Sequence, residues 1–562
     1  MACSNDNLTI ENNPTKQGKI VTLTATLSPK GGTNTKALTD PGDGTITSTW
    51  AVGEEIFVSY TDNGDTDPTA KARVTSVDGS GNATITVDLV DPKDDTQINF
   101  NYPYAANAVE KDIYYDQLGT LADVSANYDM CRGSGTLHVD AGVATLPTGV
   151  TMTRDAFIWK FTFTDGSSDI TSSITSLVVD DGMGCPYTVS PSGQSIIYVA
   201  MYGGMGATPY SITATTNSGV YTKTSGSVSL DNGKLYTSNN LALTAAAEVN
   251  LASKTEDYTA TSGDVLTGTL DPAYKLIIPM DAVVMLKGAT INYGGYDGPA
   301  IKCEGRATIV LADGTTNSVT VPGGTTPNQS GYPGIWAGDY GTKLTIKGGT
   351  GVLNIVGGFL AAGIGYPHYG FTGDGSHQCG VIQIDGGVIN SYAGHVSALG
   401  DGCESGIGSI CSAGSGDLCE GIIINGGTVT AKGGTAGIGS SGGADVGFIT
   451  INGGTVNATG GEDSPGIGAG PYASCGDITI NGGTVTAIGG GDAAGIGSGA
   501  GTSNYTSLTI ASGITKVTAT RGGNGTAAPI GRGKEDATSP DPVFSGVTKD
   551  AVNSTENTWI YE

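Results

Sequence analysis

An internal repeat in the second half of the chain constrains the fold more than any other feature. The run INGGTVNA at residues 451–458 returns as INGGTVTA at residues 480–487. A second motif, GIG in most copies, supplies one isoleucine per repeat, at Ile335, Ile364, Ile407, Ile438, Ile467, Ile496 and Ile530. The separations between these isoleucines are 29, 43, 31, 29, 29 and 34 residues. A period near 29 residues predicts one supersecondary unit stacked on copies of itself.

The content of the repeat indicates that the unit is made of β-strands. Residues 422–431 read IIINGGTVTA, two short runs separated by a Gly-Gly pair, with no apolar stripe of helix length. A coil of three short strands with glycine-rich corners suits one turn of a parallel β-helix, whose coils lie about 4.8 Å apart. We predict a parallel β-helix over residues 246–540, with the isoleucines stacked in its core. Residues 541–562 are expected to form a C-terminal capping segment, in which Trp559 and Tyr561 cover the last coil.

Glycine and asparagine recur at fixed places in the repeat. Glycine makes up 92 of the 562 residues, and its regular placement favours tight corners over disorder. The residue before the Gly-Gly pair is Asp385, Asn425, Asn452 or Asn481. We expect these side chains to hydrogen-bond to one another along the axis of the coil and so stabilise the bend.

The charge of the chain excludes one class of partner. Lys and Arg number 26 against 53 Asp and Glu, which leaves a formal net charge of −27. Such a surface repels phosphate backbones, so we expect no nucleic-acid partner.

The longest apolar run, Leu276 to Leu286, is much too short to cross a bilayer. Any membrane attachment is expected only through a lipid at the N-terminus.

The first residues indicate such a lipid. Ala2-Cys3-Ser4 before a polar stretch resembles the start of a bacterial lipoprotein whose signal peptide has been removed. Cys3 is then the lipid attachment site, within a leader segment over residues 1–17. The alternative is an ordinary cysteine near the N-terminus.

The other eight cysteines form an even number, which permits disulfides in an exported protein. Cys403, Cys411 and Cys419 are eight residues apart, unlike the close pairs of structural zinc sites. We therefore expect disulfides or packed thiols, and no metal.

The first part of the chain is rich in short strands. Residues 18–245 predict one or two β-sandwiches, and two would be divided near residues 125–150. The strands expected are Ile20 to Leu27, Glu55 to Tyr60, Ala72 to Val77, Ala83 to Leu89, Phe157 to Phe163, Ser195 to Met201 and Ser211 to Thr216. The fold class is therefore all-β, with an N-terminal β-sandwich region followed by a parallel β-helix.

Several motifs of this region, taken in order, carry a resemblance to a known family. They are WAVGE at 50–54, TSVDG at 75–79, YPY at 102–104, GTLAD at 119–123, FIWKFTF at 157–163 and GKLY at 233–236. Over about the first 245 residues the chain resembles the fimbrillin-like surface lipoproteins of Gram-negative anaerobes. The resemblance implies a β-sandwich pilin or adhesin, lipid-anchored at the outer membrane or built into a fimbria.

In many members of this family a protease cuts near the N-terminus and the subunits polymerise by donor-strand exchange. The resemblance therefore implies other fimbrial subunits as partners, and a cut after a basic residue. Lys16, Lys19, Lys30 and Lys36 are available. A β-helix follows where a simple stalk subunit would end, which favours a tip or accessory role.

One stretch of the repeat is irregular and holds the candidate binding residues. The separation of 43 residues between Ile364 and Ile407 exceeds the usual 29 by 14, which predicts an inserted loop. Tyr340 and Tyr369 each lie five residues after a stacked isoleucine, so they should be neighbours near Trp336. We predict a surface that binds a host or matrix glycan or protein. The candidate residues are Trp336, Tyr340, Tyr366, His368, Tyr369 and Phe371. In the alternative, these rings cover a glycine-rich corner or pack beneath the inserted loop.

A metal site and an enzyme are the competing hypotheses. His368, Asp374 and His377 have metal-binding side chains but no supporting spacing, so we expect neither metal nor cofactor.

A β-helix lyase needs a basic cleft, yet between Gly348 and Leu508 the only Lys or Arg is Lys432. A glycoside hydrolase needs two carboxylates across a cleft. The candidates are Asp374, Asp385, Asp401, Glu404 and Asp417, and no two occupy equivalent positions of adjacent coils.

The sequence therefore predicts a non-enzymatic, cell-surface fimbrial adhesin, with a polysaccharide-degrading enzyme, a hydrolase more than a lyase, as the alternative.

Overall fold

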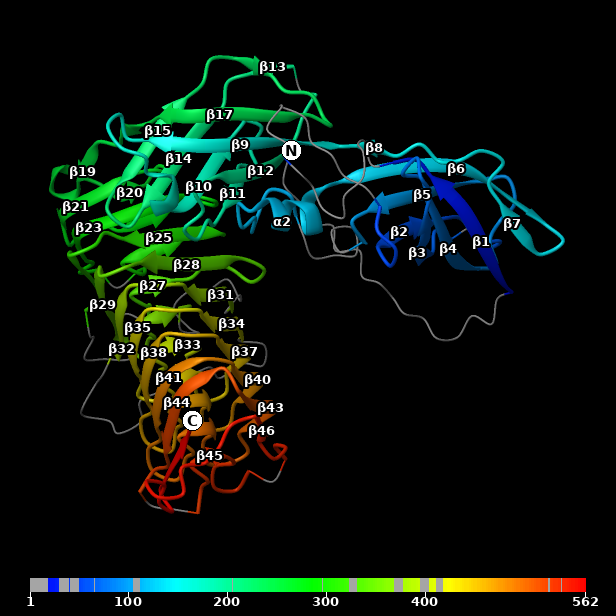
Figure 1. Ribbon diagram of the computed structural model, residues 1–562. Coiled ribbons are helices and arrows are strands. Elements are labelled where there is room, and N and C mark those ends of the chain that lie inside the picture. The colour runs from blue at the N-terminus through cyan, green and yellow to red at the C-terminus, as the bar shows by residue number, and fades with distance from the viewer. Residues whose placement is uncertain are drawn as a thin grey trace. The chain divides into compact units, whose positions relative to one another are not determined.

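The computed structural model describes residues 19–29, 40, 50–64, 66–104, 112–204, 206–295, 297–322, 331–367, 378–394, 404–410, 418–523, 526–536 and 538–562. These residues fall into two compact units (Figure 1). The first runs to Ala245 without Asn217–Val220, and the second comprises Asn217–Val220 and Ala246–Glu562. The described residues are almost entirely β-strand and connecting turns. Their helices are short: α2 (Leu121–Asp123), η1 (Val124–Tyr128), η2 (Thr171–Ser173) and η3 (Leu251–Ser253).

The first domain of unit one is a sheet that closes on itself. Its strands follow the order β5-β2-β3-β4-β1-β7-β6-β8, and an additional pairing of β5 with β6 closes the ring. β1 alternates exposed and buried residues, so that Val21, Leu23, Ala25 and Leu27 all point into the core. The strands are β1 (Ile20–Leu27), β2 (Glu55–Ser59), β3 (Thr69–Val77), β4 (Ala83–Val90), β5 (Thr96–Tyr102), β6 (Cys131–Asp140), β7 (Val143–Thr145) and β8 (Thr153–Arg154).

The second domain of unit one consists mainly of two sheets around an aromatic core. One sheet has the order β11-β10-β14-β15-β18, the other β12-β9-β17, and β13 pairs with β16. The rings of Phe161 and Phe163 stack at 5.2 Å in this core. The strands are β9 (Ala156–Thr164), β10 (Ile174–Asp180), β11 (Tyr187–Val189), β12 (Ile197–Tyr202), β13 (Ala207–Thr208), β14 (Ser211–Thr216), β15 (Val220–Thr224), β16 (Val228–Ser229), β17 (Leu235–Ala242) and β18 (Thr244–Ala245).

Unit two is a parallel β-helix, as the repeat predicts. One face is a sheet of short strands, one per coil: β20 (Tyr258–Thr259), β22 (Leu276–Ile278), β24 (Ile301–Cys303), β27 (Ile335–Trp336), β30 (Ile364–Gly365), β33 (Ile407–Gly408), β36 (Ile438–Gly439), β39 (Ile467–Ala469), β42 (Ile496–Ser498) and β45 (Ile530–Gly531). The seven isoleucines of the repeat pair one above another along this face. The predicted isoleucine column is therefore confirmed.

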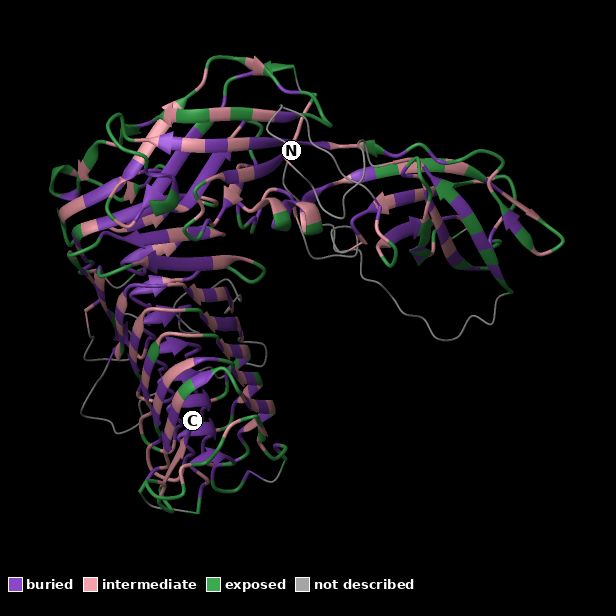
Figure 2. Cartoon of the chain, in the orientation of Figure 1, coloured by how far each residue is buried: buried purple, intermediate pink, exposed green. Residues whose placement is uncertain are grey.

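The other two faces belong to one continuous sheet, which begins with β19 (Glu248–Asn250). The strands of the first of these faces are β21 (Val265–Leu270), β23 (Val283–Asn292), β25 (Ala307–Leu311), β28 (Lys343–Gly348), β31 (Gln378–Ile384), β34 (Leu418–Ile424), β37 (Asp445–Ile451), β40 (Ser474–Ile480), β43 (Asn504–Ala511) and β46 (Val543–Ser545). Those of the second are β26 (Thr316–Thr320), β29 (Val352–Phe359), β32 (Val388–Gly394), β35 (Thr428–Lys432), β38 (Thr455–Thr459), β41 (Gly483–Ile488), β44 (Ile514–Thr520) and β47 (Thr558–Tyr561). Along these strands, buried residues alternate with partly exposed ones (Figure 2).

The last strand ends the parallel stack. β47 pairs antiparallel with β44, so that Tyr561 lies opposite Val517 and Trp559 opposite Ala519. The Tyr561 ring stacks on Phe544 with centroids 4.4 Å apart, and the Lys549 ammonium lies 3.9 Å from the centre of the Trp559 ring. A strand that runs in the opposite direction interrupts the repeat at this end and covers apolar groups of the final coil.

The side chains before the Gly-Gly pairs form the predicted ladder. The amide of Asn425 donates to Asp385 Oδ1 at 2.8 Å, that of Asn452 to Asn425 at 2.8 Å, and that of Asn481 to Asn452 at 2.9 Å. The structural interpretation of Asp385 is thereby confirmed. At the same bend Gly454 has a φ of +82°, which explains why the corner takes glycine.

The described cysteines are mostly packed thiols. Cys131, Cys303, Cys379, Cys419 and Cys475 are buried and form no disulfide bond with a described residue, whereas Cys185 is disulfide-bonded. Cys379 lies directly opposite Cys419 on adjacent coils and points into the apolar interior. Burial raises the pKa of the Cys303 thiol to about 12 and also raises the pKa of Cys379 and of Cys475.

We expect the free energy of unfolding of unit two to fall as the pH rises above about 9, the ordinary thiol value. The buried thiols hold their protons to higher pH in the folded chain than in the unfolded chain. Their contribution is therefore complete below pH 9 and is lost as the pH rises toward the raised value. Urea unfolding near neutral pH and at about pH 10 measures the free energy of unfolding under the two conditions. Cys303→Ala should reduce the difference between the two free energies. A midpoint independent of pH, or thiols that iodoacetamide alkylates as fast with urea as without it, would contradict the expectation.

Candidate binding surface

The predicted aromatic surface begins at Trp336, the residue after the stacked Ile335. Trp336 lies between Lys302 on the preceding coil and Gly365 on the next. The Lys302 ammonium is 5.7 Å from the centre of the Trp336 ring and forms an ion pair of 3.0 Å with Glu304. Trp336 is only partly buried, and its neighbour Gly365 has no side chain to cover it. The indole is thus packed on one side and accompanied by a cation.

A short turn presents Tyr340 to solvent. Thr342 Oγ1 donates to the carbonyl oxygen of Asp339 at 2.6 Å, and Gly341 has a φ of +79°. The N–H of Gly341 donates to Glu420 Oε2 at 2.9 Å, which fastens the turn to a strand further along the β-helix. The Tyr340 side chain is 56% exposed. An exposed phenol on a fixed turn can stack on a sugar ring or an apolar group of a partner without first being ordered.

Tyr472 occupies the equivalent offset after the stacked Ile467. It is 71% exposed and has a φ of +58°. The corner that carries Tyr340 thus presents a second tyrosine several coils away, which provides a matched control for the experiment below.

The remaining predicted site residues differ in their placement. Tyr366 is fully buried in the core of the β-helix, so its ring is not accessible to a ligand. His368, Tyr369 and Phe371 lie outside the described residues, as does Cys3. Of the predicted site residues that the structure describes, Tyr340 is exposed, whereas Trp336 is partly buried against the core of the β-helix.

The metal and carboxylate alternatives fall largely outside the described residues as well. These include Asp374, His377, Asp401 and Asp417. Glu404 is buried, and Asp385 belongs to the asparagine ladder. Among the described residues, Asp94, Asp95 and His138 have potential ligand atoms within 4.8 Å of one another, but all three lie at the surface, where acidic groups are often close without a metal. Within the described part of the chain, no helix has the length and apolar character needed to cross a membrane.

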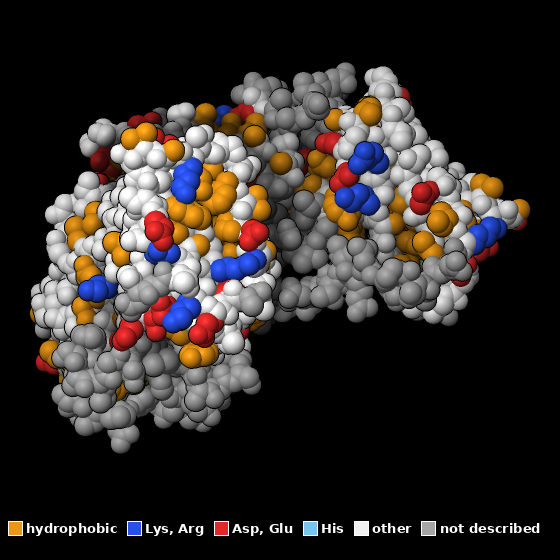
Figure 3. Space-filling model, turned by 90° about the horizontal axis from the view of Figure 1, so that it is seen from below, with side chains coloured by type: hydrophobic (Ala, Val, Ile, Leu, Met, Phe, Trp, Pro, Cys, Tyr) orange, Lys and Arg blue, Asp and Glu red, His pale blue; other side chains and the backbone are white. Residues whose placement is uncertain are grey.

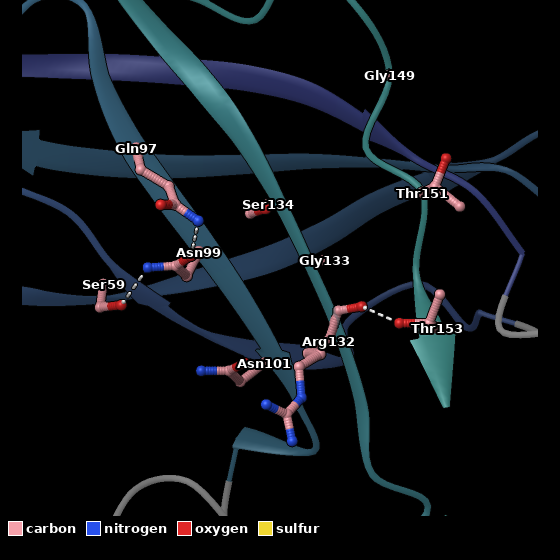
Figure 4. Close-up of a pocket in the computed structure, with 10 residues that line it drawn as sticks. All are labelled: Ser59, Gln97, Asn99, Asn101, Arg132, Gly133, Ser134, Gly149, Thr151 and Thr153. Carbon is pink, nitrogen blue, oxygen red and sulfur yellow. Dashed lines mark hydrogen bonds between the residues drawn. The ribbon is translucent and has the colours of Figure 1, made fainter. Parts of the chain in front are cut away.

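A polar groove on the first domain was not predicted from the sequence. It lies on the outer face of β2, β5, β6 and β8 and has a volume of about 680 Å³ (Figure 4). Three amide side chains, Gln97, Asn99 and Asn101, alternate along β5 with the buried Ile98 and Phe100. The sequence contains one signal of this polar face, because the outward positions of β5 carry amides and no charged side chains. This signal does not show which other strands complete the groove.

The strand order and stacked coils define the class of fold: an all-β protein with a parallel β-helix in its second half. A family model described as a beta helix repeat matches residues 422–443, 449–471 and 478–500, in agreement with the stacked coils. No curated protein matches the sequence.

Solved structures of low similarity include fimbrial and adhesion proteins. A fimbrial assembly protein from Parabacteroides distasonis has a TM-score of 0.25 at 10% identity, covering 40% of this chain and 91% of its own. A putative cell adhesion protein from the same species has a TM-score of 0.20 at 13% identity, covering 36% and 79%. A fimbrial protein from Bacteroides ovatus has a TM-score of 0.19 at 11% identity, and the match covers 40% of this chain and about half, 51%, of that one. At these TM-scores the likeness carries no argument about function.

Proposed function

We propose that the chain is a cell-surface fimbrial protein in a tip or accessory position, and that its β-helix holds an adhesive surface toward host or matrix material. The observation that carries the proposal is the exposed Tyr340 on a hydrogen-bonded turn of the β-helix. Binding residues on a rigid scaffold lose little conformational entropy when they engage a partner.

The β-helix has the dimensions of a spacer. Its short-strand face contains ten paired strands, from β20 to β45. With nine spacings of about 4.8 Å, this face extends over roughly 43 Å. Because the described strands of each coil pair with those of its neighbours, their sheets have open edges at the two ends, which suits a stiff rod that does not aggregate through its edges.

The charge pattern favours a neutral glycan or a protein surface over a polyanion. On the face shown in Figure 3, Lys and Arg side chains stand singly or in small groups beside Asp and Glu, among many uncharged groups. The whole chain carries a net charge of −27. Long-range electrostatics would therefore oppose the approach of a strongly anionic polymer.

The proposed role is non-enzymatic. A glycoside hydrolase requires a pair of carboxylates across an open cleft. Asp385 accepts hydrogen bonds from Gln383 and Asn425 within the ladder, both at 2.8 Å, and Glu404 is buried. Neither of these two candidates has the exposed position that a catalytic acid needs. Activity on a polysaccharide that is lost in Asp374→Ala or Asp401→Ala would favour the enzyme instead.

The proposed assembly partner is another fimbrial subunit, joined by donor-strand exchange. β1 pairs with β4 over all eight of its residues but with β7 only through Leu23 and Ala144. A cut after β1 would free a strand that buries four alternating apolar side chains and leave a groove of matching pattern. A chain that lacks residues 1–29 should bind a peptide of the β1 sequence, and failure to bind it would argue against exchange at this strand.

The proposed anchor is a lipid on Cys3. Expressed behind a lipoprotein export signal in a Gram-negative host, the protein should fractionate with the outer membrane, and Cys3→Ala should release it. An unchanged distribution would contradict the anchor without affecting the adhesive role.

Replacing Trp336, Tyr340 and Tyr369 together by Ala should weaken binding to host cells or glycan arrays at least tenfold. The loss of three aromatic contacts accounts for an effect of about 1.4 kcal/mol or more. Tyr472→Ala is the matched control, because this tyrosine has the same offset on another coil and is more exposed than Tyr340. Unchanged binding by the triple variant, or equal loss in the control, would contradict the location of the surface.

A further inference from the structure

The polar groove of the first domain has the size of a ligand site. Its volume of about 680 Å³ lies within the range of roughly 300–1,000 Å³ that small-molecule sites occupy. Residues 149–153 form one wall, and they approach β6 so closely that a Cβ on Gly133 would lie 2.6 Å from the Val150 side chain and 2.7 Å from the carbonyl oxygen of Thr151. Because Gly133 has no Cβ, residues 149–153 can pack this closely against β6.

The strand register places polar side chains in two rows across the groove. In one row Asn99 lies opposite Ser59 on β2 and Ser134 on β6. In the other, Asn101 lies opposite Arg132, which in turn lies opposite Thr153 on β8. Figure 4 shows the three amides of β5 in succession, with Arg132 and Ser134 on the neighbouring strand. Because strands fix these positions, the rows are arranged before any ligand arrives.

Much of the hydrogen-bonding capacity of the groove is unused. Gln97 Nε2 donates to Asn99 Oδ1 at 3.0 Å, and Asn99 Nδ2 donates weakly to Ser59 Oγ at 3.4 Å. No hydrogen bond from the side chains of Asn101, Ser134 or Thr151 to another described residue is present. An amide offers two N–H donors and a carbonyl acceptor, and a hydroxyl can donate and accept. The groove therefore presents donors and acceptors side by side.

The groove also carries little net charge. The described residues that line it include no Asp or Glu, although the chain as a whole carries a net charge of −27. Arg132, the cation among these lining residues, donates from Nε to Asp155 Oδ2. A phosphate or sulfate group would have to compete with Asp155 for this guanidinium, whereas an uncharged polyol would not.

We propose that this groove binds a neutral oligosaccharide, through amide and hydroxyl contacts to its hydroxyl groups. Alternate residues of a strand lie about 7 Å apart, so the row of Gln97, Asn99 and Asn101 extends over roughly 14 Å. A row of this length suits a chain of linked sugars better than a single one. This site is distinct from the aromatic surface of the β-helix, and it lies on a different unit of the chain.

The test uses the full chain and isothermal titration calorimetry with soluble mannan, laminarin, arabinogalactan and chitohexaose, and with polygalacturonate as the anionic probe. At least one neutral probe should bind, and the double variant Asn99→Ala, Asn101→Ala should weaken that binding at least tenfold. Ser134→Trp should abolish it by filling the groove. The double variant Thr24→Ala, Thr86→Ala is the control, because these threonines face outward as a pair on β1 and β4. It should bind like the unmodified chain.

The site is refuted if none of the neutral probes binds, if only polygalacturonate binds, or if the Asn99 and Asn101 variants bind unchanged. Unaltered thermal unfolding of these variants checks that the substituted domain remains folded. The triple aromatic variant of the β-helix should keep its affinity for the neutral probe. Loss in that variant alone would place the saccharide on the β-helix and overturn the groove.

Discussion

Replacing Gly468 by Ala is expected to destabilise the β-helix by about 4 kcal/mol or more. Gly468 has a φ of +133°, a conformation that residues with a side chain rarely adopt. An added Cβ would also lie well inside contact distance of the carbonyl oxygen of Gly497 on the next coil. Because the coils are hydrogen-bonded at this point, the substitution must either break the pairing of β39 with β42 or push the coils apart. Hydrogen exchange of peptides from residues 438–531 measures the loss locally.

Gly314→Ala separates the two causes of that destabilisation. Gly314 belongs to the same unit and has a φ of +68°, but a Cβ there would meet nothing within 4 Å. The backbone strain alone should cost about 1 kcal/mol. Equal effects of the two substitutions would show that close stacking of the coils at Gly468 contributes nothing.

Replacing Asp129 by Ala is expected to destabilise unit one by about 4 kcal/mol. Arg154 Nε donates to Asp129 Oδ1 at 2.7 Å, and a second guanidinium nitrogen donates to Oδ2 at 3.3 Å. The side chains of Arg154 and Asp129 are only 6% and 3% exposed. Arginine cannot neutralise itself by losing a proton, so removal of Asp129 leaves a buried charge without its principal partner. Urea unfolding followed by hydrogen exchange of β6 and β8 gives the measurement.

The double variant Asp129→Ala, Arg154→Met tests whether the buried charge causes this effect. It removes both charges and keeps an apolar chain in place of Arg154, so it should recover most of the lost stability. A double variant as unstable as Asp129→Ala would show that packing around Asp129, and not the ion pair, dominates.

The β-helix could be predicted from the sequence because its information is local and repeated. Ile438, Ile467 and Ile496 recur at the period of one coil, and the residues before the Gly-Gly pairs recur with them. A ladder such as Asn452 to Asn425 follows directly once the period is known. In a parallel β-helix, residues one repeat apart in the sequence become neighbours on adjacent coils. The spacing alone therefore predicts the contact.

The closure of the first domain could not be predicted in this way. The pairing of β5 with β6 joins Thr96 to Leu137 and Tyr102 to Cys131, across a long intervening segment with no repeat. Alternation shows that each strand has one buried face, but it does not determine which strands are neighbours. The ion pair between Arg154 and Asp129 depends on the same tertiary arrangement.

The candidate surfaces show the same limit. The offset of five residues from a stacked isoleucine predicts the corner of the coil for Tyr340, which is exposed. Tyr366 lies only two residues after its own isoleucine and is fully buried, so its inclusion in the predicted surface was wrong. The polar groove is assembled from β2, β5, β6 and β8, so Asn99 and Thr153 meet only in the folded domain. For a site built from several strands, the sequence of each strand indicates the chemistry of its side chains. The register of the strands in the folded sheet determines which of these side chains become neighbours.

Cross-linking of stacked outward positions tests the β-helix most directly. Thr455 and Thr484 are register partners on adjacent coils, whereas Thr486 pairs with Asn457. In the pair Thr455→Cys, Thr484→Cys the two thiols lie within reach of dibromobimane, a short reagent that fluoresces after it joins two thiols. We expect rapid bridging in this pair and little in the pair Thr455→Cys, Thr486→Cys, whose sites are offset by two residues, with the native buried thiols unreactive. No bridging in the first pair, or equal bridging in both, would contradict the stacking of one coil per repeat.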